Sequence, residues 1–391
     1  MINNSTMKLG ILTQSMSGNY GCNLQMYALQ TVLQRMGHDV EILNVKVPQL
    51  MKPFSKRVVD SIFSLTKICI KILIGRPIYI PIKQSQYNYF CQLISPFHRK
   101  YLRGGPPCRG KDELSEYVKR MHFEGFIVGS DQVWRPCYNL NGRLENMFLD
   151  FTEGLECKRV AYAASFGVDN WEYTKHQTLN CSILAQRFDA VSVRERSGIT
   201  LCRDYLGIDA INVLDPTMLL DRIDYEELID SASQTASGGN LYHYVLDKTE
   251  EIQKGIKYVE STLGLTAFTY LNPCPEGTYK LFHKRNSIFP SVEQWLQGFR
   301  DADLVLVDSF HGTVFSIIFN KPFWVIGNPK RGMTRFESLL KLFSLEDRLI
   351  SANELLTINL HSPIDWDFVN KRRSELKSIS LDFLKEALKQ K

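Results

Sequence analysis

The sequence lacks the features that define several large classes of protein. None of its nine cysteines forms a CxxC pair, and an odd number scattered over 391 residues argues against a disulfide framework or a structural zinc site. No stretch reaches the roughly 18 uninterrupted apolar residues that a membrane span needs. The first residues lack the basic start and the apolar stretch of a signal peptide. We therefore expect reduced thiols and a cytoplasmic protein.

A strong charge of one sign is also missing. The formal net charge is only +5, and no Lys/Arg-rich run with interleaved aromatic residues occurs, so we expect no nucleic-acid partner. One local exception lies between Lys52 and Lys83, where seven basic residues accompany a single acid, Asp60. Apolar runs alternate with these basic residues. The pattern suits an interfacial helix with peripheral contact at the inner face of the plasma membrane, or an amphipathic insertion packed on the first domain.

What the chain does contain is a repeated strand-helix pattern. The run "KLGILTQ" reads as a strand, the next apolar residues have the spacing of one helix face, and "DVEILNV" reads as a second strand, which predicts a parallel sheet. Later strands end in polar or small residues, as in "FIVGSDQ", "RVAYAASFG", "AVSVRE" and "INVLDP". Ligands bind at that end of the strands in doubly wound sheets.

A second alternation of strands and helices follows residues 221–239, whose polar, Ser/Thr/Gly-rich composition is typical of a linker. The predicted fold is therefore α/β, with two Rossmann-like domains facing across a cleft in a GT-B-like arrangement. We place the first domain at residues 1–225, with the basic insertion at about 50–118, and the second at 235–366. A C-terminal helix, 367–391, packs on one of the two domains.

The second domain contains a histidine where a strand ends and a helix begins, in "LVLVDSFHG". The free N–H groups of that helix and the imidazole of His311 can address the same anion, with Ser309 and Gly312 allowing a tight entry into the helix. The alternative is a simple cap, in which Asp308 or Ser309 satisfies the helix start and His311 packs beside it.

Two loops of the first domain carry groups suited to carbohydrate. Ser130 and Asp131 follow a strand, and the Asp131 carboxylate is either a helix cap or an acceptor and base for a sugar hydroxyl. The loop "SGNYGCNLQ" is neither GxGxxG nor a P-loop, but Asn19, Asn23 and Gln25 can exchange hydrogen bonds with hydroxyls. Equally, the Asn and Gly residues can serve the turn alone.

Arginines supply the candidate anion-binding groups. Arg194 lies at a strand end beside Glu195, and Arg331 and Arg335 follow the last predicted strand of the second domain. An arginine at the ligand edge of a sheet can hold a carboxylate or phosphate with two parallel hydrogen bonds. The alternative is a set of solvated surface charges. No cluster of residues has the spacing of a metal site, so we expect no metal and no cofactor.

Six segments in register resemble the polysaccharide pyruvyl transferase family. They cover most of residues 8–350 and read, in order, "SGNYGCNLQMYALQTVLQRMGHDVEILN", "FIVGSDQVWRP", "VAYAASFG", "VSVRERSG", "VLDPTMLL" and "DSFHGTVFSIIFNKPFWVIG". The resemblance implies an enzyme that transfers pyruvate from phosphoenolpyruvate to two hydroxyls of a sugar in a cell-surface polysaccharide precursor, such as exopolysaccharide or capsule, giving a ketal. The first domain would then be the acceptor side and the second the donor side.

The resemblance also implies roles for single residues. Arg194 would bind phosphoenolpyruvate, the donor substrate, and His311 would serve catalysis, with Asp131 as the candidate base. Where other branches of the family have Arg-Leu-His, this chain has Ser309-Phe310-His311, so one donor-binding arginine is missing there. Our hypothesis is that Arg331 or Arg335 supplies that charge.

Three functions remain open on the sequence. The acceptor sugar of a pyruvyl transferase is a polysaccharide precursor, including a lipid-linked oligosaccharide. A GT-B glycosyltransferase using a nucleotide sugar shares the two-domain shape. A non-catalytic polysaccharide-assembly protein would explain the missing arginine.

Overall fold

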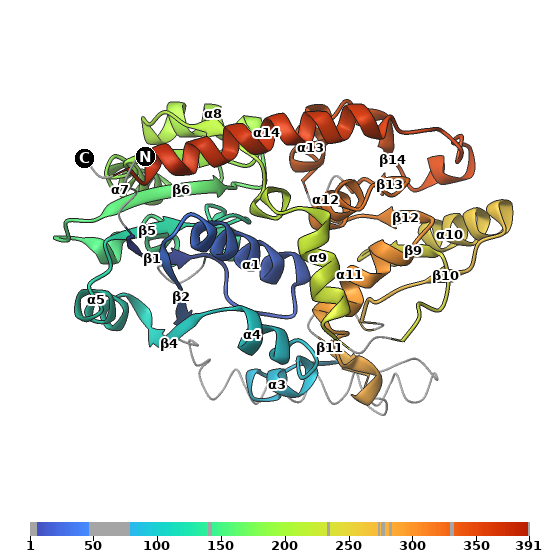
Figure 1. Ribbon diagram of the computed structural model, residues 1–391, viewed down its shortest axis with the longest axis horizontal. Helices are drawn as coiled ribbons and strands as arrows, with labels where there is room; N and C mark the ends of the chain where they lie inside the picture. The colour runs from blue at the N-terminus through green and yellow to red at the C-terminus, as the bar shows by residue number, and fades with distance from the viewer. Residues whose placement is uncertain are drawn as a thin grey trace.

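The chain is arranged around two parallel sheets in this computed structural model (Figure 1). The structure describes residues 6–46, 79–139, 143–232, 235–272, 274, 278–280, 284–328 and 332–389. The first sheet has seven strands in the order β4-β2-β1-β5-β6-β7-β8 and the second has five in the order β10-β9-β12-β13-β14. The predicted α/β class is therefore confirmed.

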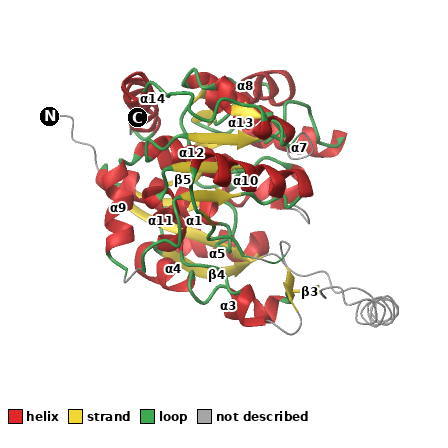
Figure 2. Ribbon diagram, turned by 90° about the vertical axis from the view of Figure 1, so that its right-hand side faces the viewer, coloured by secondary structure: helices red, strands yellow, loops and turns green. Residues whose placement is uncertain are grey.

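The strands of the first sheet are β1 (Lys8–Leu12), β2 (Asp39–Lys46), β4 (Gly104–Arg109), β5 (Gly125–Val128), β6 (Lys158–Ala164), β7 (Ala190–Val193) and β8 (Ile211–Asn212). Those of the second sheet are β9 (Leu241–Tyr244), β10 (Ala267–Phe268), β12 (Leu304–Val307), β13 (Phe323–Ile326) and β14 (Leu349–Ile350). Every pairing in both sheets is parallel. Helices cover the sheets on both faces, as a doubly wound fold requires (Figure 2).

The α-helices are α1 (Tyr20–Arg35), α3 (Tyr87–Phe90), α4 (Ser95–Tyr101), α5 (Gly110–Arg120), α6 (Arg143–Asn146), α7 (Lys175–Ala185), α8 (Arg196–Leu201), α9 (Arg222–Asp230), α10 (Glu250–Leu263), α11 (Val292–Asp301), α12 (Phe310–Ile318), α13 (Thr334–Leu342) and α14 (Trp366–Ala387). A short 3-10 helix, η5 (Pro216–Leu219), follows β8. None of the helices among the described residues is both long and apolar enough to cross a bilayer.

Each sheet reverses its winding direction once. In the first sheet the chain moves outward from β1 to β2 and β4, then returns to β5 on the other side of β1 and continues to β8. In the second sheet the same reversal falls between β9 and β12. Loops diverge at such switch points and leave room for a ligand beyond the carboxyl ends of the strands. The loops after β1, β5, β9 and β12 are thus the places where the fold favours a site.

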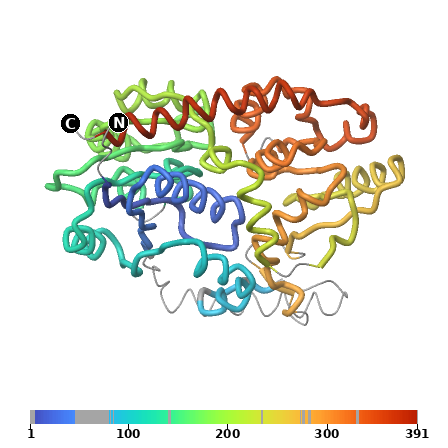
Figure 3. The backbone as a smooth tube through the Cα atoms, in the orientation of Figure 1, coloured from blue at the N-terminus to red at the C-terminus, as the bar shows by residue number. Residues whose placement is uncertain are grey.

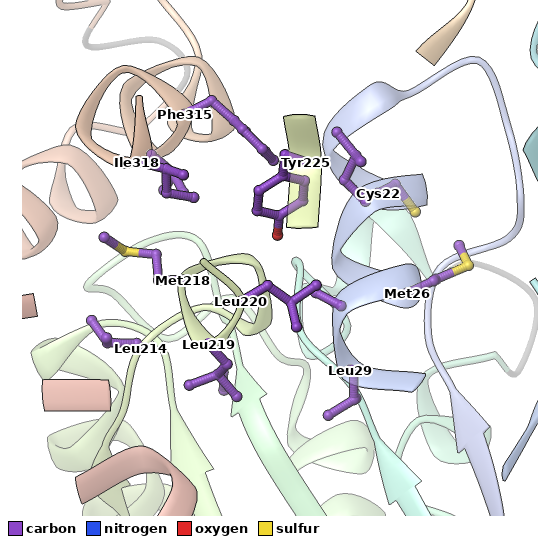
Figure 4. Packing of buried hydrophobic residues seen from close by; sticks show 14 of the residues in the cluster. Cys22, Met26, Leu29, Leu214, Met218, Leu219, Leu220, Tyr225, Phe315 and Ile318 are labelled. Carbon is purple, nitrogen blue, oxygen red and sulfur yellow. The ribbon is translucent and has the colours of Figure 1, made fainter. Parts of the chain in front are cut away.

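A shared hydrophobic core joins the two domains. Side chains from α1, η5, α9 and α12 point toward one another in Figure 4, and all belong to one buried cluster that runs through both sheets. At its centre Tyr20 of α1 stacks on Trp295 of α11, with ring centroids 5.5 Å apart. Helix α1 is buried on most of its surface because it is covered by the first sheet and by the second domain.

Two further elements connect the domains. Strand β3 (Tyr79–Pro81) pairs antiparallel with β11 (Thr278–Lys280), so a segment of the predicted insertion is held by the second domain. Helix α14 returns from the second domain across the first (Figure 3). There Ser380 accepts a hydrogen bond of 3.0 Å from the backbone N–H of Leu214, while Arg372 donates to the carbonyl of Leu342 in the second domain. The C-terminal helix therefore packs on both domains rather than on one.

One expectation about the chain is wrong. The stretch 221–239 was expected to be a linker, but α9 occupies Arg222–Asp230. A capping box at Asp221 and Asp224 starts this helix, and Tyr225 is fully buried against Phe315. Its polar composition marks a helix that buries only one face, not an exposed connection. The predicted domain boundaries stay predictions, as does the membrane contact, because residues 47–78 lie outside the described chain.

We predict that Trp295→Ala lowers the free energy of unfolding by about 3–5 kcal/mol, because it removes a buried indole on which Tyr20 of the other domain stacks. Since the core is shared, the protein should still unfold in a single transition. Calorimetry, with the exposed Tyr258→Ala as control, measures both. Two separate transitions, of which only one shifts, would contradict a shared core.

Candidate active site

The candidate site lies where the two switch points face each other. Ser130 and Asp131 follow β5 in the first domain, and Ser309 and His311 follow β12 in the second. His311 packs directly on the first turn of α1, where a Cβ added to Gly21 would lie 2.1 Å from the imidazole Nδ1. Only glycine fits there. The two halves of the site are therefore in contact.

A buried carboxylate, Asp215, lies at the centre of the site. Its Oδ1 accepts hydrogen bonds from the backbone N–H and the hydroxyl of Thr217, at 3.0 and 2.7 Å. Its Oδ2 accepts from the Ser130 hydroxyl at 2.8 Å and from Nη1 of Arg194 at 3.0 Å. Nε2 of His311 lies 3.5 Å from the same oxygen, within ion-pair range but beyond a good hydrogen bond.

The charge on Asp215 is maintained by these neighbours. Burial alone would raise the pKa of Asp215, but His311, Arg194 and Thr217 together hold it well below its ordinary value. The carboxylate is therefore ionised at neutral pH. It fixes the positions of one group that follows β5, one that follows β7 and one from α12.

Arg194 has N–H donors that its protein neighbours do not use. Its side chain is 1% exposed, and its guanidinium stacks 4.3 Å from the ring centre of Phe310 in the opposite domain. Its Nη2 lies 3.6 Å from Asp131, while neither Nη2 nor Nε makes a hydrogen bond within the described part of the chain. Burial would lower the pKa of Arg194, but Asp215, Asp131 and Glu195 raise it above its ordinary value. The guanidinium is thus a permanent cation.

A second guanidinium, that of half-buried Arg335 in α13, is influenced by the charge of Arg194. Burial and repulsion by Arg194 lower the pKa of Arg335 to about 10, against the opposing effect of Asp131 and Glu195. Both arginines therefore remain charged at neutral pH. Two cations near each other in a buried site favour an anion between them.

Glu195 shapes the neighbouring loop. Its Oε1 accepts hydrogen bonds from the Ser165 hydroxyl and from the N–H groups of Phe166 and Gly167, at 3.0, 2.7 and 3.0 Å. This fixes the loop after β6. A Cβ on Gly332 would meet the carbonyl of Gly167 at 2.8 Å, so the second domain approaches this loop closely.

Asp131 is held in an uncommon conformation. Its φ is 73°, in the left-handed region that residues other than glycine seldom adopt. Its Oδ1 accepts a hydrogen bond of 2.9 Å from the following N–H of Gln132. Such conformations cluster at functional sites because the surrounding structure must impose them. The carboxylate is 13% exposed, so it can be reached from outside the core.

Several predicted site residues have local structural duties. Ser309 caps α12 by accepting a hydrogen bond of 3.0 Å from Gly312 N–H, and Gly312 is needed because a Cβ there would meet Ser309 Oγ at 2.7 Å. Asp308 does not cap this helix, since its two oxygens accept from the N–H groups of Leu246 and Asp247, both at 2.8 Å.

The predicted acceptor residues of the first loop also have protein partners. Asn19 caps α1 through Cys22 N–H at 3.1 Å. Asn23 donates to the Ser17 carbonyl at 2.8 Å, and Gln25 donates to the hydroxyl of Thr13 at 2.9 Å. Asn23 and Gln25 are fully buried, so in this structure they do not line the site. Their contact with an acceptor stays a prediction, and Arg331 lies outside the described residues.

Comparison with known proteins identifies the family. Residues 19–330 match the model of the family described as polysaccharide pyruvyl transferase. The chain belongs to the polysaccharide pyruvyl transferase family. No curated protein gives a significant match. No group of three or more His, Cys, Asp or Glu residues suited to a metal ion occurs among the residues that the structure describes.

Solved structures resemble this pyruvyl transferase family member in fold. UGT89C1 from Arabidopsis thaliana, solved with quercetin, has 9% identity over 98% of this chain and 100% of its own, with a TM-score of 0.51. A UDP-GlcNAc 2-epimerase from Methanocaldococcus jannaschii has 12% identity over 95% of this chain and 99% of its own, with a TM-score of 0.49. The glycosyltransferase SnogD from Streptomyces nogalater has 10% identity over 98% of this chain and 100% of its own, with a TM-score of 0.46. The likeness to UGT89C1, with its TM-score above 0.5, confirms the predicted GT-B-like fold.

Sequence reasoning missed two residues of this pyruvyl transferase family member. Asp215 sits in "VLDP", at a strand end like Asp131 and Asp308, and that shared position was the available signal. Arg143 opens α6 and lies near the same edge of the first sheet, but no sequence pattern distinguishes it. A shallow surface pocket of about 320 Å³ lies elsewhere, lined by Ser182, Ile183, Gln186 and Arg203–Gly207, and contains none of the site residues.

Replacing Asp215 with Asn should destabilise the protein by about 3–5 kcal/mol at pH 7, because it removes the carboxylate that is hydrogen-bonded to the buried Arg194 and leaves only the longer contact to Asp131. The folded pKa of Asp215 is depressed, so its stabilising effect is present above pH ~4 and is lost as the pH falls below that value. Denaturant unfolding from pH 7 to pH 2.5 measures the difference, with exposed Asp204→Asn as control. A difference that does not shrink in acid would refute this assignment.

Gly21→Ala should displace the His311 ring and lower the free energy of unfolding by about 1–3 kcal/mol, since the added methyl group overlaps the imidazole. Gly238→Ala is the matched control, because a Cβ there meets nothing within 4 Å. Thermal unfolding compares the two variants. Equal melting temperatures would mean that His311 does not pack on α1.

Proposed function

We propose that this member of the family transfers the pyruvyl group of phosphoenolpyruvate to two hydroxyls of a sugar, forming a ketal and releasing phosphate. One observation carries the proposal: the guanidinium of Arg194 and the imidazole of His311, from opposite domains, meet at Asp215 Oδ2 at 3.0 and 3.5 Å, while Nε and Nη2 of Arg194 make no hydrogen bond within the described residues. The charge of Arg335 in α13 acts on Arg194 as well. Phosphoenolpyruvate bears a phosphate and a carboxylate, and arginine matches both in charge and geometry.

The nearby residues suit each step of that reaction. His311 would protonate the vinyl CH₂ carbon of the donor, giving a methyl group and an oxocarbenium-like carbon that still carries phosphate. One sugar hydroxyl attacks this carbon and loses its proton to Asp131. The second hydroxyl then displaces phosphate and returns its own proton to the histidine. The departing phosphate takes the proton held by Asp131 and leaves as the hydrogen phosphate dianion, held by Arg194 and Arg335, so that Asp131 is again a carboxylate. Atoms and charges balance, and His311 ends the cycle protonated.

Binding of the donor would also release Asp131. In the structure its carboxylate is 3.6 Å from Nη2 of Arg194, a long contact with no hydrogen bond. A donor phosphate offers Arg194 a stronger partner, which frees Asp131 to accept the hydroxyl proton. Because Arg194 is 1% exposed beneath Phe310, the domains must part for the donor to enter.

The test compares wild type with His311→Gln and Arg335→Ala. Millimolar phosphoenolpyruvate should raise the melting temperature of wild type and of His311→Gln. Arg335→Ala should weaken binding by about 10- to 100-fold, because a charge-assisted contact is lost. His311→Gln should slow phosphate release by about 100-fold or more while donor binding is kept.

A UDP-sugar serves as the control ligand. Stabilisation by the UDP-sugar, with no effect of phosphoenolpyruvate at any salt concentration, would replace the proposal with a nucleotide-sugar glycosyltransferase. Stabilisation by neither ligand, together with binding of an oligosaccharide, would favour a non-catalytic polysaccharide-assembly protein.

A further inference from the structure

Another buried arginine of the first domain lies beside the loop after β1. Arg143 is the first residue of α6 and is only 9% exposed. Its Nη2 donates a long hydrogen bond of 3.3 Å to the Ser15 hydroxyl, and its Nε has no hydrogen-bond partner among the described residues. The guanidinium therefore keeps unused donors inside the protein.

Arg143 differs from two other buried arginines, Arg194 and Arg348, in its electrostatic surroundings. Arg194 has Asp215 and Asp131, and Arg348 has Asp347. Within the described chain no carboxylate forms an ion pair with Arg143, and burial lowers its pKa with only the thiol of Cys22 opposing the shift. A buried cation without an anion is unfavourable for the folded protein. Its presence points to an anion that comes from outside.

The place of Arg143 suits a ligand. Ser15 lies in the loop after β1, at the switch point of the first sheet, and this loop leads into the N-terminus of α1. Helix α1 is 16 residues long and has no acidic residue in its first turn, so its positive end is not neutralised there. In that first turn, the charge of Asp131 raises the pKa of the Cys22 thiol and the charge of Arg143 lowers it. The loop after β1 thus lies among three groups, which are the unpaired cation Arg143, the N-terminus of α1 and the proposed base Asp131.

We propose that Arg143, Ser15 and the N-terminus of α1 bind a phosphate group of the acceptor, so that the acceptor is a phosphate ester of a sugar and not a neutral saccharide. The inference rests on the proposed function, because Arg194 and Arg335 there take the anionic groups of the donor and leave this second cation for the acceptor. A sugar held by its phosphate at Arg143 can present hydroxyls to Asp131. Nucleotide-linked and lipid-linked sugars share this chemistry.

The test uses inorganic pyrophosphate as the minimal probe, in the presence of saturating phosphoenolpyruvate so that the donor site is filled. Pyrophosphate should still stabilise wild type against heat. Arg143→Met should weaken pyrophosphate binding about tenfold or more and leave the affinity for phosphoenolpyruvate unchanged. Without ligands, this variant should be as stable as wild type or more stable, since it removes an unpaired buried charge and keeps the apolar volume.

Arg203→Met is the matched control, because its side chain is 66% exposed and lies in the surface pocket away from the site. It should bind both probes as wild type does. Should Arg143→Met not fold, Arg143→Lys replaces it, with pyrophosphate binding again weakened because lysine lacks the planar fork. The binding of UDP-glucose and of a polyprenyl diphosphate sugar in micelles is then measured for wild type and Arg143→Met. The ligand whose affinity falls in the variant identifies the acceptor as nucleotide-linked or lipid-linked.

Each outcome decides something. Weakened binding of both pyrophosphate and phosphoenolpyruvate would place Arg143 in the donor site and overturn the inference. A loss of stability without ligand, with unchanged pyrophosphate affinity, would make Arg143 structural and also overturn it. If phosphoenolpyruvate never binds but pyrophosphate binding depends on Arg143, the phosphate site stands and the proposed donor falls.

Discussion

The buried carboxylate of Asp215 is the interaction on which the rest of the site depends. An isolated charge in a protein interior is strongly unfavourable, so Asp215 must be surrounded by donors and cations. Ser130, Thr217 and Arg194 come from the first domain and His311 from the second. The full set exists only when both domains are in contact. One ionised group thus couples the folding of the interface to the assembly of the site.

This coupling explains why the site is closed in the structure. Arg194 stacks on Phe310, the His311 imidazole leaves no space beyond Gly21, and β3 pairs with β11 across the domains. Charged groups are therefore fixed before any ligand arrives, which is the condition for strong electrostatic stabilisation of a reacting anion. The same packing makes ligand entry depend on movement between the domains.

The sequence indicates a departure from the family pattern at Ser309-Phe310-His311, and the structure gives each residue there a use. Ser309 caps α12, Phe310 supports the guanidinium of Arg194, and His311 contacts Asp215 and α1. A second cation is still present in α13, where the charge of Arg194 contributes to lowering the pKa of Arg335. The hypothesis that an arginine after the last strand supplies the missing charge stays a prediction.

The amino-acid sequence by itself determined the two α/β units and the ends of their strands, since apolar periodicity and turn residues are local properties. It also placed Asp131, Arg194 and His311 at strand ends, which share one edge of each sheet in a parallel fold. Only the tertiary structure decided which polar groups meet. Asn23 and Gln25 are buried because α1 is covered on both sides. Residues 222–230 form helix α9, with Tyr225 packed into the shared core. The roles of Asp215 and Arg143 follow from their burial. Burial and charge pairing depend on contacts distant in sequence, and no local pattern contains them.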